Sequence, residues 1–183
     1  MLQNYNKWRI LRIFFDDPNP KGGFQLREIS RKAGIAPTSV KRYLNELSRE
    51  GKHGYALVIK SKHRVHGYPL YWANRDSELF LFYKKIDTII RFRESGLLDF
   101  LWDSCMPETI ILFGSAARGE DIKDSNIDIF AQCRERKLNL TEYEKRTGRR
   151  INVLFAENFN KLSGELKNNI LNGIVLKGYL KAF

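Results

Sequence analysis

The sequence has few of the residues that would tie a chain to disulfides, export or a membrane. Its 183 residues include two cysteines, Cys105 and Cys133, in unrelated settings without a Cys-x-x-Cys spacing, so we expect neither a disulfide nor a metal site from them. No apolar run approaches the length that crosses a bilayer. Residues 1–6 have neither the basic start nor the apolar core of an export signal, so we expect cytoplasmic residence and no membrane partner.

Acidic residues are also scarce, and the deficit is concentrated in one part of the chain. The protein carries 32 Lys+Arg against 21 Asp+Glu, a formal net charge of +11. Residues 1–75 hold 15 basic against 5 acidic residues, whereas residues 76–183 hold 17 against 16. A solvated basic surface is one interpretation, but a basic excess confined to one segment favours a polyanionic partner and points to nucleic acid.

The basic segment has the pattern of short helices followed by a hairpin. Apolar spacing predicts helices over residues 6–15, 24–33 and 37–49, with a tight turn at 34–36 and a stop at Gly51. Residues 56–61 and 68–73 read as strands joined by a basic hairpin tip at 62–67. We interpret Tyr43 and Trp72 as packing residues of the core.

Two helices joined by a turn and followed by a hairpin resemble the winged-helix family, over about residues 5–75. The resemblance implies binding to double-stranded DNA, which the basic excess supports independently, although some winged helices only dock proteins. The candidate contacts are outward side chains that can donate to phosphates and base edges. They are Thr38, Ser39, Lys41, Arg42 and Asn45 of the second helix, and Lys62, Arg64 and His66 of the hairpin.

The middle of the chain reads as linker helices. Residues 76–93 have apolar side chains at helical spacing, and residues 97–102 form a second short helical pattern. We expect these elements to connect two domains over residues 76–106. The apolar stripe of the longer helix is also compatible with a homodimer.

The stretch from Ile110 to Phe130 combines a glycine turn with a carboxylate on a strand. The apolar run 110–113 predicts a buried strand, Gly114 and Ser115 end it, and 116–118 favour a helical turn. A second strand, 127–132, carries Asp128 among apolar residues. Backbone N–H groups after a glycine can approach a phosphate closely, and a carboxylate beside them can hold the cation that a phosphate carries.

This stretch resembles the signature of minimal nucleotidyltransferases, which are small members of the DNA polymerase β-like superfamily. The resemblance covers about residues 105–183 and is carried by Gly114-Ser115, Arg118-Gly119 and residues 125–129. It implies that Gly114, Ser115 and Arg118 contact a nucleoside triphosphate. It also implies three acids, at positions 126, 128 and 152, that bind Mg²⁺ with the triphosphate and catalyse transfer.

Two of the three family acids are absent, because positions 126 and 152 are Asn126 and Asn152 and only Asp128 is retained. An amide offers a neutral carbonyl oxygen to a metal but no charge. Glu120, Asp121 and Asp124 could in principle substitute, although loop carboxylates are more often solvated. A cluster of three arginines, Arg146, Arg149 and Arg150, reads either as a solvated face or as a phosphate contact.

The sequence therefore predicts an α+β protein with a winged helix-turn-helix at 1–75, linker helices at 76–106 and a nucleotidyltransferase-like mixed sheet flanked by helices at 107–183. We expect a DNA-binding regulator whose second domain binds a nucleoside triphosphate with Mg²⁺ but has weakened or lost transfer. One alternative is an active, antitoxin-like enzyme that transfers a nucleoside monophosphate to a protein or RNA hydroxyl. A second is a module that only binds a protein partner.

Overall fold

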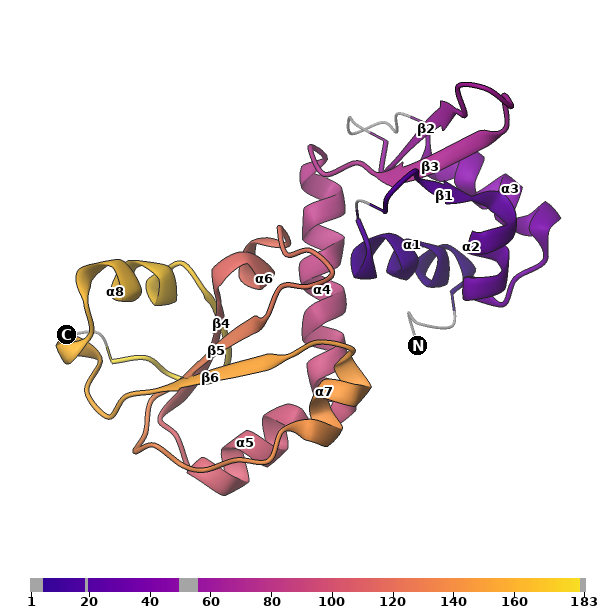
Figure 1. The fold of residues 1–183 in the computed structure, drawn as a ribbon. Helices are drawn as coiled ribbons and strands as arrows, with labels where there is room; N and C mark the ends of the chain where they lie inside the picture. Colours follow the sequence, from indigo (N-terminus) through magenta and orange to yellow (C-terminus); the bar gives the residue numbers. More distant parts are fainter. Residues whose placement is uncertain (1–4, 19, 50–55, 182–183) are drawn as a thin grey trace. The chain divides into compact units, whose positions relative to one another are not determined.

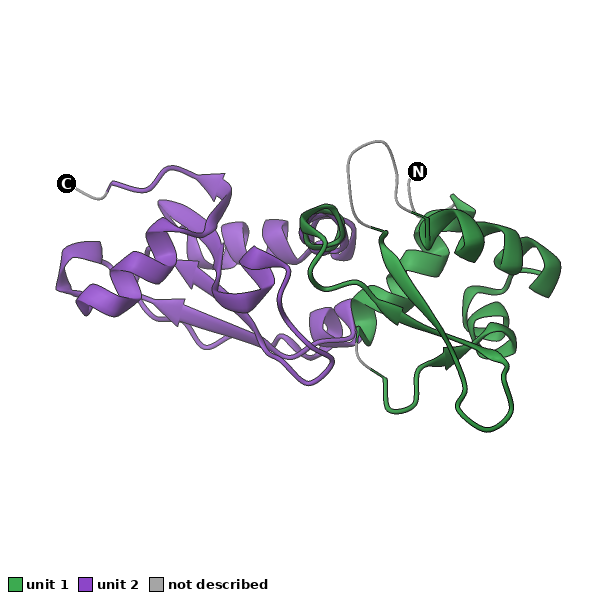
Figure 2. Cartoon of the chain, turned by 90° about the horizontal axis from the view of Figure 1, so that it is seen from above, with its two compact units in different colours: residues 1–84 green, residues 85–183 purple. Residues whose placement is uncertain are grey.

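The computed structural model describes residues 5–18, 20–49 and 56–181, and its backbone contacts divide the chain into two compact units. The units are residues 1–84 and 85–183, drawn in green and purple in Figure 2. The helix α4 (Glu78–Ser95) begins in the first unit and ends in the second. The predicted helix stop at Gly51 lies outside the described residues.

The first unit combines three helices with a small antiparallel sheet. The helices are α1 (Asn6–Asp16), α2 (Leu26–Ala33) and α3 (Pro37–Leu47). The strands, in the order β1-β3-β2 across the sheet, are β1 (Phe24–Gln25), β2 (Val58–Lys62) and β3 (Pro69–Ala73). Both strand pairs are antiparallel, and β2 and β3 form a hairpin.

The turn between α2 and α3 depends on a glycine. Gly34 has the left-handed φ of 63°, which glycine adopts without strain, and the Ile35 N–H returns to the Ser30 carbonyl at 3.2 Å. Pro37 then occupies the first turn of α3, where its missing N–H is no loss. Both helices and the turn lie where the sequence predicts them, except that α2 begins two residues later and α3 ends two residues earlier.

Phe24 explains why α2 begins later than predicted. It pairs with Tyr71 of β3, and its ring meets Phe14 edge-on with 5.6 Å between centroids. Its side chain is 2% exposed. Strand pairing and burial of the aromatic ring therefore override the helical spacing that residues 24–33 have in the sequence.

The second unit is built on a four-stranded mixed sheet (Figure 1). Its strands, in the order β6-β5-β4-β7, are β4 (Thr109–Phe113), β5 (Ile127–Ala131), β6 (Ile151–Phe155) and β7 (Ile174–Gly178). β5 and β6 are parallel, whereas β4 is antiparallel to both β5 and β7. The predicted α+β class with a mixed sheet and flanking helices is confirmed.

Helices cover both faces of this sheet, which explains why every residue of β4 is buried. On one face, α5 (Leu97–Cys105), α7 (Thr141–Thr147) and the end of α4 pack in one apolar cluster with Leu112 of β4. On the other face, the 3₁₀ helix η2 (Phe159–Lys161) and α8 (Gly164–Leu171) pack against Ile111 and Phe130. Side chains that alternate along a strand thus enter two separate cores.

Two side chains divide residues 158–171 into the separate elements η2 and α8. The Asn158 Oδ1 accepts from the Asn160 N–H at 2.9 Å and the Ser163 Oγ accepts from the Leu166 N–H at 3.3 Å, so each side chain caps its own helix start. The apolar segment after Gly173 is the strand β7 beside β4.

The two cysteines are neighbours, so the expectation that they occupy unrelated settings is wrong. Both thiols are free. Burial raises the pKa of Cys105, and burial together with the Cys105 thiol raises the pKa of Cys133 to about 11. Because the thiolate is the nucleophile, a raised thiol pKa leads us to expect slow reaction of both side chains at neutral pH.

Within the described chain, none of the helices combines the length and the apolar character that a membrane span requires.

Gly178 offers a test of how β7 closes the sheet. It has φ of 82°, and a Cβ there would overlap the Glu108 carbonyl oxygen and lie 2.9 Å from the Thr109 Cα. We expect Gly178→Ala to lower the free energy of unfolding by about 2–5 kcal/mol, since it adds backbone overlap to a left-handed φ. Urea denaturation checks this value.

The matched control is Gly96→Ala, because Gly96 has the similar φ of 79° but open space around its Cβ direction. It should lose only the left-handed contribution of about 1–2 kcal/mol. Equal losses in the two variants would contradict tight packing of β7 at Gly178.

Candidate functional site

The register of β5 brings the predicted site residues to one edge of the sheet. Asp128 of β5 pairs with Phe113, the last residue of β4, on one side. It pairs with Asn152 of the parallel strand β6 on the other. Gly114, which follows Phe113, therefore lies beside the Asp128 side chain, and the Gly-Ser turn and two of the three family positions are brought together.

Asp128 is in contact with both neighbours. The Nδ2 of Asn152 donates a hydrogen bond to the Asp128 Oδ1 at 3.1 Å. A Cβ on Gly114 would lie 3.0 Å from the Asp128 Oδ2. Gly114 also has φ of 72°, so both the backbone conformation and the available space favour glycine at this position.

The amide of Asn152 changes the electrostatics of the pair. An aspartate at this position would place a second negative charge against Asp128, and two adjacent carboxylates require a cation or a shared proton. The Asn152 Nδ2 instead supplies a neutral donor to the Asp128 Oδ1. The Asp128 carboxylate therefore faces a neutral hydrogen-bond donor at the position where an aspartate would place a second negative charge.

Asn126 lies immediately before β5, two residues ahead of Asp128, and is exposed. It lines a polar pocket of about 380 Å³, formed by Lys123, Asp124, Ser125, Asn126, Gly148, Arg149 and Arg150.

Ser115 and Arg118 belong to the short helix α6 (Gly114–Arg118), which directly follows β4. Ser115 is half-buried, and its carbonyl accepts from the Glu120 N–H at 2.9 Å. The Arg118 Nε donates to the Glu120 Oε2 at 2.7 Å, and both side chains are about half exposed. An exposed pair of this kind contributes little stability, so a stronger anion can displace Glu120.

Two of the three loop acids are already engaged. Glu120 pairs with Arg118, and Asp121 is 4% exposed and pairs with Arg149. Asp124 is exposed and lines the polar pocket. Among residues 5–18, 20–49 and 56–181, no group of three or more His, Cys, Asp or Glu side chains is arranged to hold a metal ion.

These donors fit one Mg²⁺ ion but not a two-metal centre. Mg²⁺ commonly binds through one or two carboxylates together with substrate phosphates. Asp128 supplies one carboxylate, and Asn126 and Asn152 supply neutral oxygens at best. Phosphate oxygens would have to complete the coordination.

The three arginines of the C-terminal cluster have three different environments. Arg146 donates to the Ser95 carbonyl at 2.9 Å, where it caps the end of α4. Arg149 forms a buried ion pair with Asp121, with 2.7 Å between Nη2 and Oδ2. Arg150 is exposed. The solvated interpretation is therefore wrong for Arg149, whereas Arg146 and Arg150 are both exposed.

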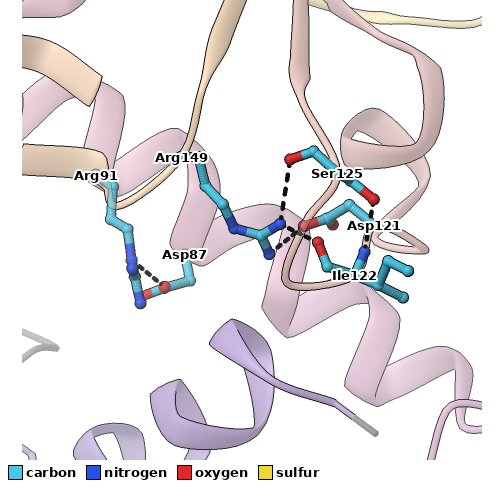
Figure 3. Close-up of polar contacts among 6 residues, drawn as sticks. All are labelled: Asp87, Arg91, Asp121, Ile122, Ser125 and Arg149. Carbon is cyan, nitrogen blue, oxygen red and sulfur yellow. Dashed lines mark hydrogen bonds and ion pairs between the residues drawn. The ribbon is translucent and has the colours of Figure 1, made fainter. Parts of the chain in front are cut away.

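Arg149 fixes the loop that leads into β5 (Figure 3). Its guanidinium also donates to the carbonyl oxygens of Ile122 and Ser125, and the Ile122 N–H donates to the Ser125 Oγ at 3.0 Å. The sequence shows the arginine but not its partners, since Asp121 is 28 positions away and nothing local links them.

In the first unit, the predicted DNA contacts of α3 are exposed or half-buried. Thr38, Lys41 and Arg42 are exposed, whereas Ser39 and Asn45 are half-buried. The Asn45 Oδ1 accepts from the Lys60 Nζ of β2 at 3.4 Å. Lys60 thus joins this surface, which the sequence did not indicate because residues 45 and 60 are distant in the chain.

Tyr43 corrects the expectation of a core residue. It is half-buried, and its hydroxyl accepts from the Asn6 Nδ2 at 3.4 Å and from the Arg42 Nη2 at 3.1 Å. These two hydrogen bonds lower the pKa of Tyr43. The Arg42 guanidinium also lies over the ring, 4.9 Å from its centroid. Trp72 is half-buried and packs against Gly23, where a Cβ would lie 2.5 Å from the indole.

The predicted hairpin contacts Lys62, Arg64 and His66 are exposed at the β2–β3 hairpin. Its tip is ordered by His63, whose Nδ1 accepts from the backbone N–H groups of residues 65 and 66 at 3.3 and 3.2 Å. The His63 ring also stacks on Tyr68, with 4.6 Å between centroids. The basic side chains are therefore carried on a hairpin tip of defined shape.

Arg149→Met tests the importance of the buried ion pair. We expect it to lower the free energy of unfolding by about 3–5 kcal/mol, because the buried Asp121 would lose the guanidinium with which it forms its ion pair. Urea denaturation measures the loss, and adding Asp121→Leu should recover part of it.

Arg134→Met is the control, since Arg134 and Glu157 form an ion pair with side chains 81% and 65% exposed. It should leave stability almost unchanged. A small effect of Arg149→Met as well would show that the loop does not depend on this ion pair.

In a comparison with known protein families, residues 89–176 match the family model of the nucleotidyltransferase domain. The matched range runs from within α4 to within β7 and includes Gly114, Asp128 and Asn152. A comparison with curated proteins finds no match.

Proposed function

From the nucleotidyltransferase-like domain at residues 89–176, we propose that this protein is a DNA-binding regulator. In this proposal, the domain binds a nucleoside triphosphate with Mg²⁺ but transfers nucleotides weakly or not at all. The observation that carries the proposal is the hydrogen bond from the Asn152 Nδ2 to the Asp128 Oδ1, at 3.1 Å. It places an amide where the chemistry would use a third acid.

Nucleotide binding and nucleotidyl transfer make different demands on this site. Binding requires backbone N–H groups near the phosphates and one carboxylate for the accompanying cation, and Gly114, Ser115 and Asp128 meet this demand. A bound Mg²⁺ would neutralise charge on the triphosphate. Transfer also requires a base that removes the proton of the attacking hydroxyl, and the amide of Asn152 cannot accept that proton.

The first unit supplies the proposed DNA-binding surface. Exposed Lys41 and Arg42 on α3, Lys60 and Lys62 on β2, and Arg64 at the hairpin tip are donors for phosphates and base edges. The net charge of +10 over residues 1–75 favours association with a polyanion over any neutral partner. We propose that this unit acts as a winged helix, with α3 in the major groove and the hairpin beside it.

Restoring the missing acids tests the proposed loss of transfer. We expect the native protein to show little nucleotidylation with labelled nucleoside triphosphates and Mg²⁺ or Mn²⁺. The Asn126→Asp/Asn152→Asp variant should gain at least about 10²-fold, the range lost when a strong electrostatic contributor is removed from an active site. Its thermal stability should also rise more on addition of Mn²⁺, since the metal relieves repulsion among three carboxylates.

The same double substitution in an Asp128→Ala background controls for nonspecific gains and should remain inactive. Robust transfer by the native protein to a protein or RNA hydroxyl, lost in Asp128→Ala, would instead favour the antitoxin-like enzyme.

Salt dependence of DNA binding tests the role of α3. In gel shifts with mixed-sequence duplex DNA, we expect Lys41→Gln/Arg42→Gln to weaken binding and to reduce the slope of log K against log salt by about 2, one for each lost phosphate contact. Lys145→Gln/Lys161→Gln removes two exposed charges from the second unit and should leave the slope unchanged. Absence of salt-sensitive binding by the native protein would favour a module that only binds proteins.

A further inference from the structure

The polar pocket of about 380 Å³ lies between two loops that precede neighbouring parallel strands. One wall is residues 123–126, before β5, and the other is residues 148–150, before β6. The Ile127 N–H donates to the Arg150 carbonyl at 2.9 Å, so strand pairing fixes the base of the pocket. Its volume is at the lower end of the range for small-molecule sites.

The hydrogen bonds and the ion pair of Arg149 hold the two walls of the pocket together (Figure 3). Arg149 reaches from the second wall to the Ser125 carbonyl of the first, at 3.4 Å, and to the Asp121 carboxylate at 2.7 Å. The pocket is therefore largely formed before any ligand binds, which limits the ordering that binding requires.

The charge inside the pocket comes from Lys123 and Arg150. Arg149 is neutralised by its buried partner Asp121. Lys123 and Arg150 are both exposed, and within the described residues neither forms an ion pair or a hydrogen bond through its side chain. A lysine and an arginine left available on facing walls suit a phosphate, which accepts several charge-assisted hydrogen bonds.

The remaining side chains suit a sugar better than a bare anion. Asp124 is a carboxylate on the same wall as Lys123, and it would repel a compact anion but accept from hydroxyl groups. Asn126 can donate and accept, and the Ser125 hydroxyl can donate because its oxygen already accepts from the Ile122 N–H. The lining thus combines two cations for a phosphate with polar groups for hydroxyls.

The strand order separates this pocket from the Gly114–Ser115 turn. Across the sheet the order is β6-β5-β4, so the turn after β4 and the loop before β6 lie on opposite sides of Asp128. We propose that the pocket binds a ribose-phosphate group as a second site, on the other side of Asp128 from the Gly114–Ser115 turn and sharing Asn126 with the site proposed for the triphosphate. The binding of ribose phosphate in this pocket does not depend on the proposed function. Only the expectation that a nucleotide binds beside the pocket rests on it.

Calorimetric titration of the full chain without metal, using ribose 5-phosphate as the probe, tests this site. We expect Lys123→Gln/Arg150→Gln to weaken binding at least tenfold, because both charged donors to the phosphate are lost. Lys145→Gln/Lys161→Gln, with the same change of charge at exposed positions outside the pocket, should bind as the native protein does. Both substituted pocket residues are exposed, so the fold should persist, and circular dichroism verifies this.

Asp128→Ala separates this proposal from the proposed function. It should weaken binding of ATP with Mg²⁺ yet retain ribose 5-phosphate binding. A native-like affinity of Lys123→Gln/Arg150→Gln, no binding of the probe by the native protein, or loss of the probe in Asp128→Ala would each overturn the second site.

Two further probes identify the source of the ribose phosphate. Tighter binding of a 5′-phosphorylated RNA trinucleotide than of AMP, with the excess lost in Lys123→Gln/Arg150→Gln, indicates the end of a nucleic-acid strand. Equal or tighter binding of AMP, lost in the same variant, indicates a free nucleotide. Both results support the site.

Discussion

The pairing of β5 with both of its neighbours is the constraint on which the second unit depends. One register places Asp128 beside Phe113 and Asn152 at the same time, and it directs Ile129 and Phe130 into the cores on opposite faces of the sheet. A slip of one residue would exchange those faces and bury a charge, so the apolar pattern that stabilises the sheet also fixes the position of the carboxylate. The geometry of the site is in this sense a consequence of core packing.

Much of this unit could be predicted because its information is local in the sequence. The apolar run before Gly114, the glycine turn and the position of Asp128 in β5 all follow from residues next to one another. The partners of Arg149 and the contact between Asn45 and Lys60 could not be predicted, because they join segments that are distant in the chain. β7 was missed because three apolar residues after a glycine can equally belong to a packed tail, and only the free edge of β4 gives them a strand partner.

The arginines near β6 show that basic residues close together in a sequence can have different structural roles. Arg146 bonds to the end of α4, Arg149 is buried with Asp121, and Arg150 is exposed. Neighbouring positions in a turn point in different directions, so each side chain meets a different environment. The net charge of such a segment therefore overstates the positive charge that a ligand would encounter.

The strand order of the second unit has a consequence during synthesis. β4 is the first strand of this unit to be made and is buried along its whole length in the folded protein, but β7, the strand that covers one of its edges, follows only after β5, α7, β6 and α8. Until then, β4 presents a hydrophobic edge with unpaired backbone groups, which is a template for pairing with other chains. The nascent protein is thus most prone to aggregate in the interval before Gly178 has been added, and a slow step in that interval would lengthen the exposure.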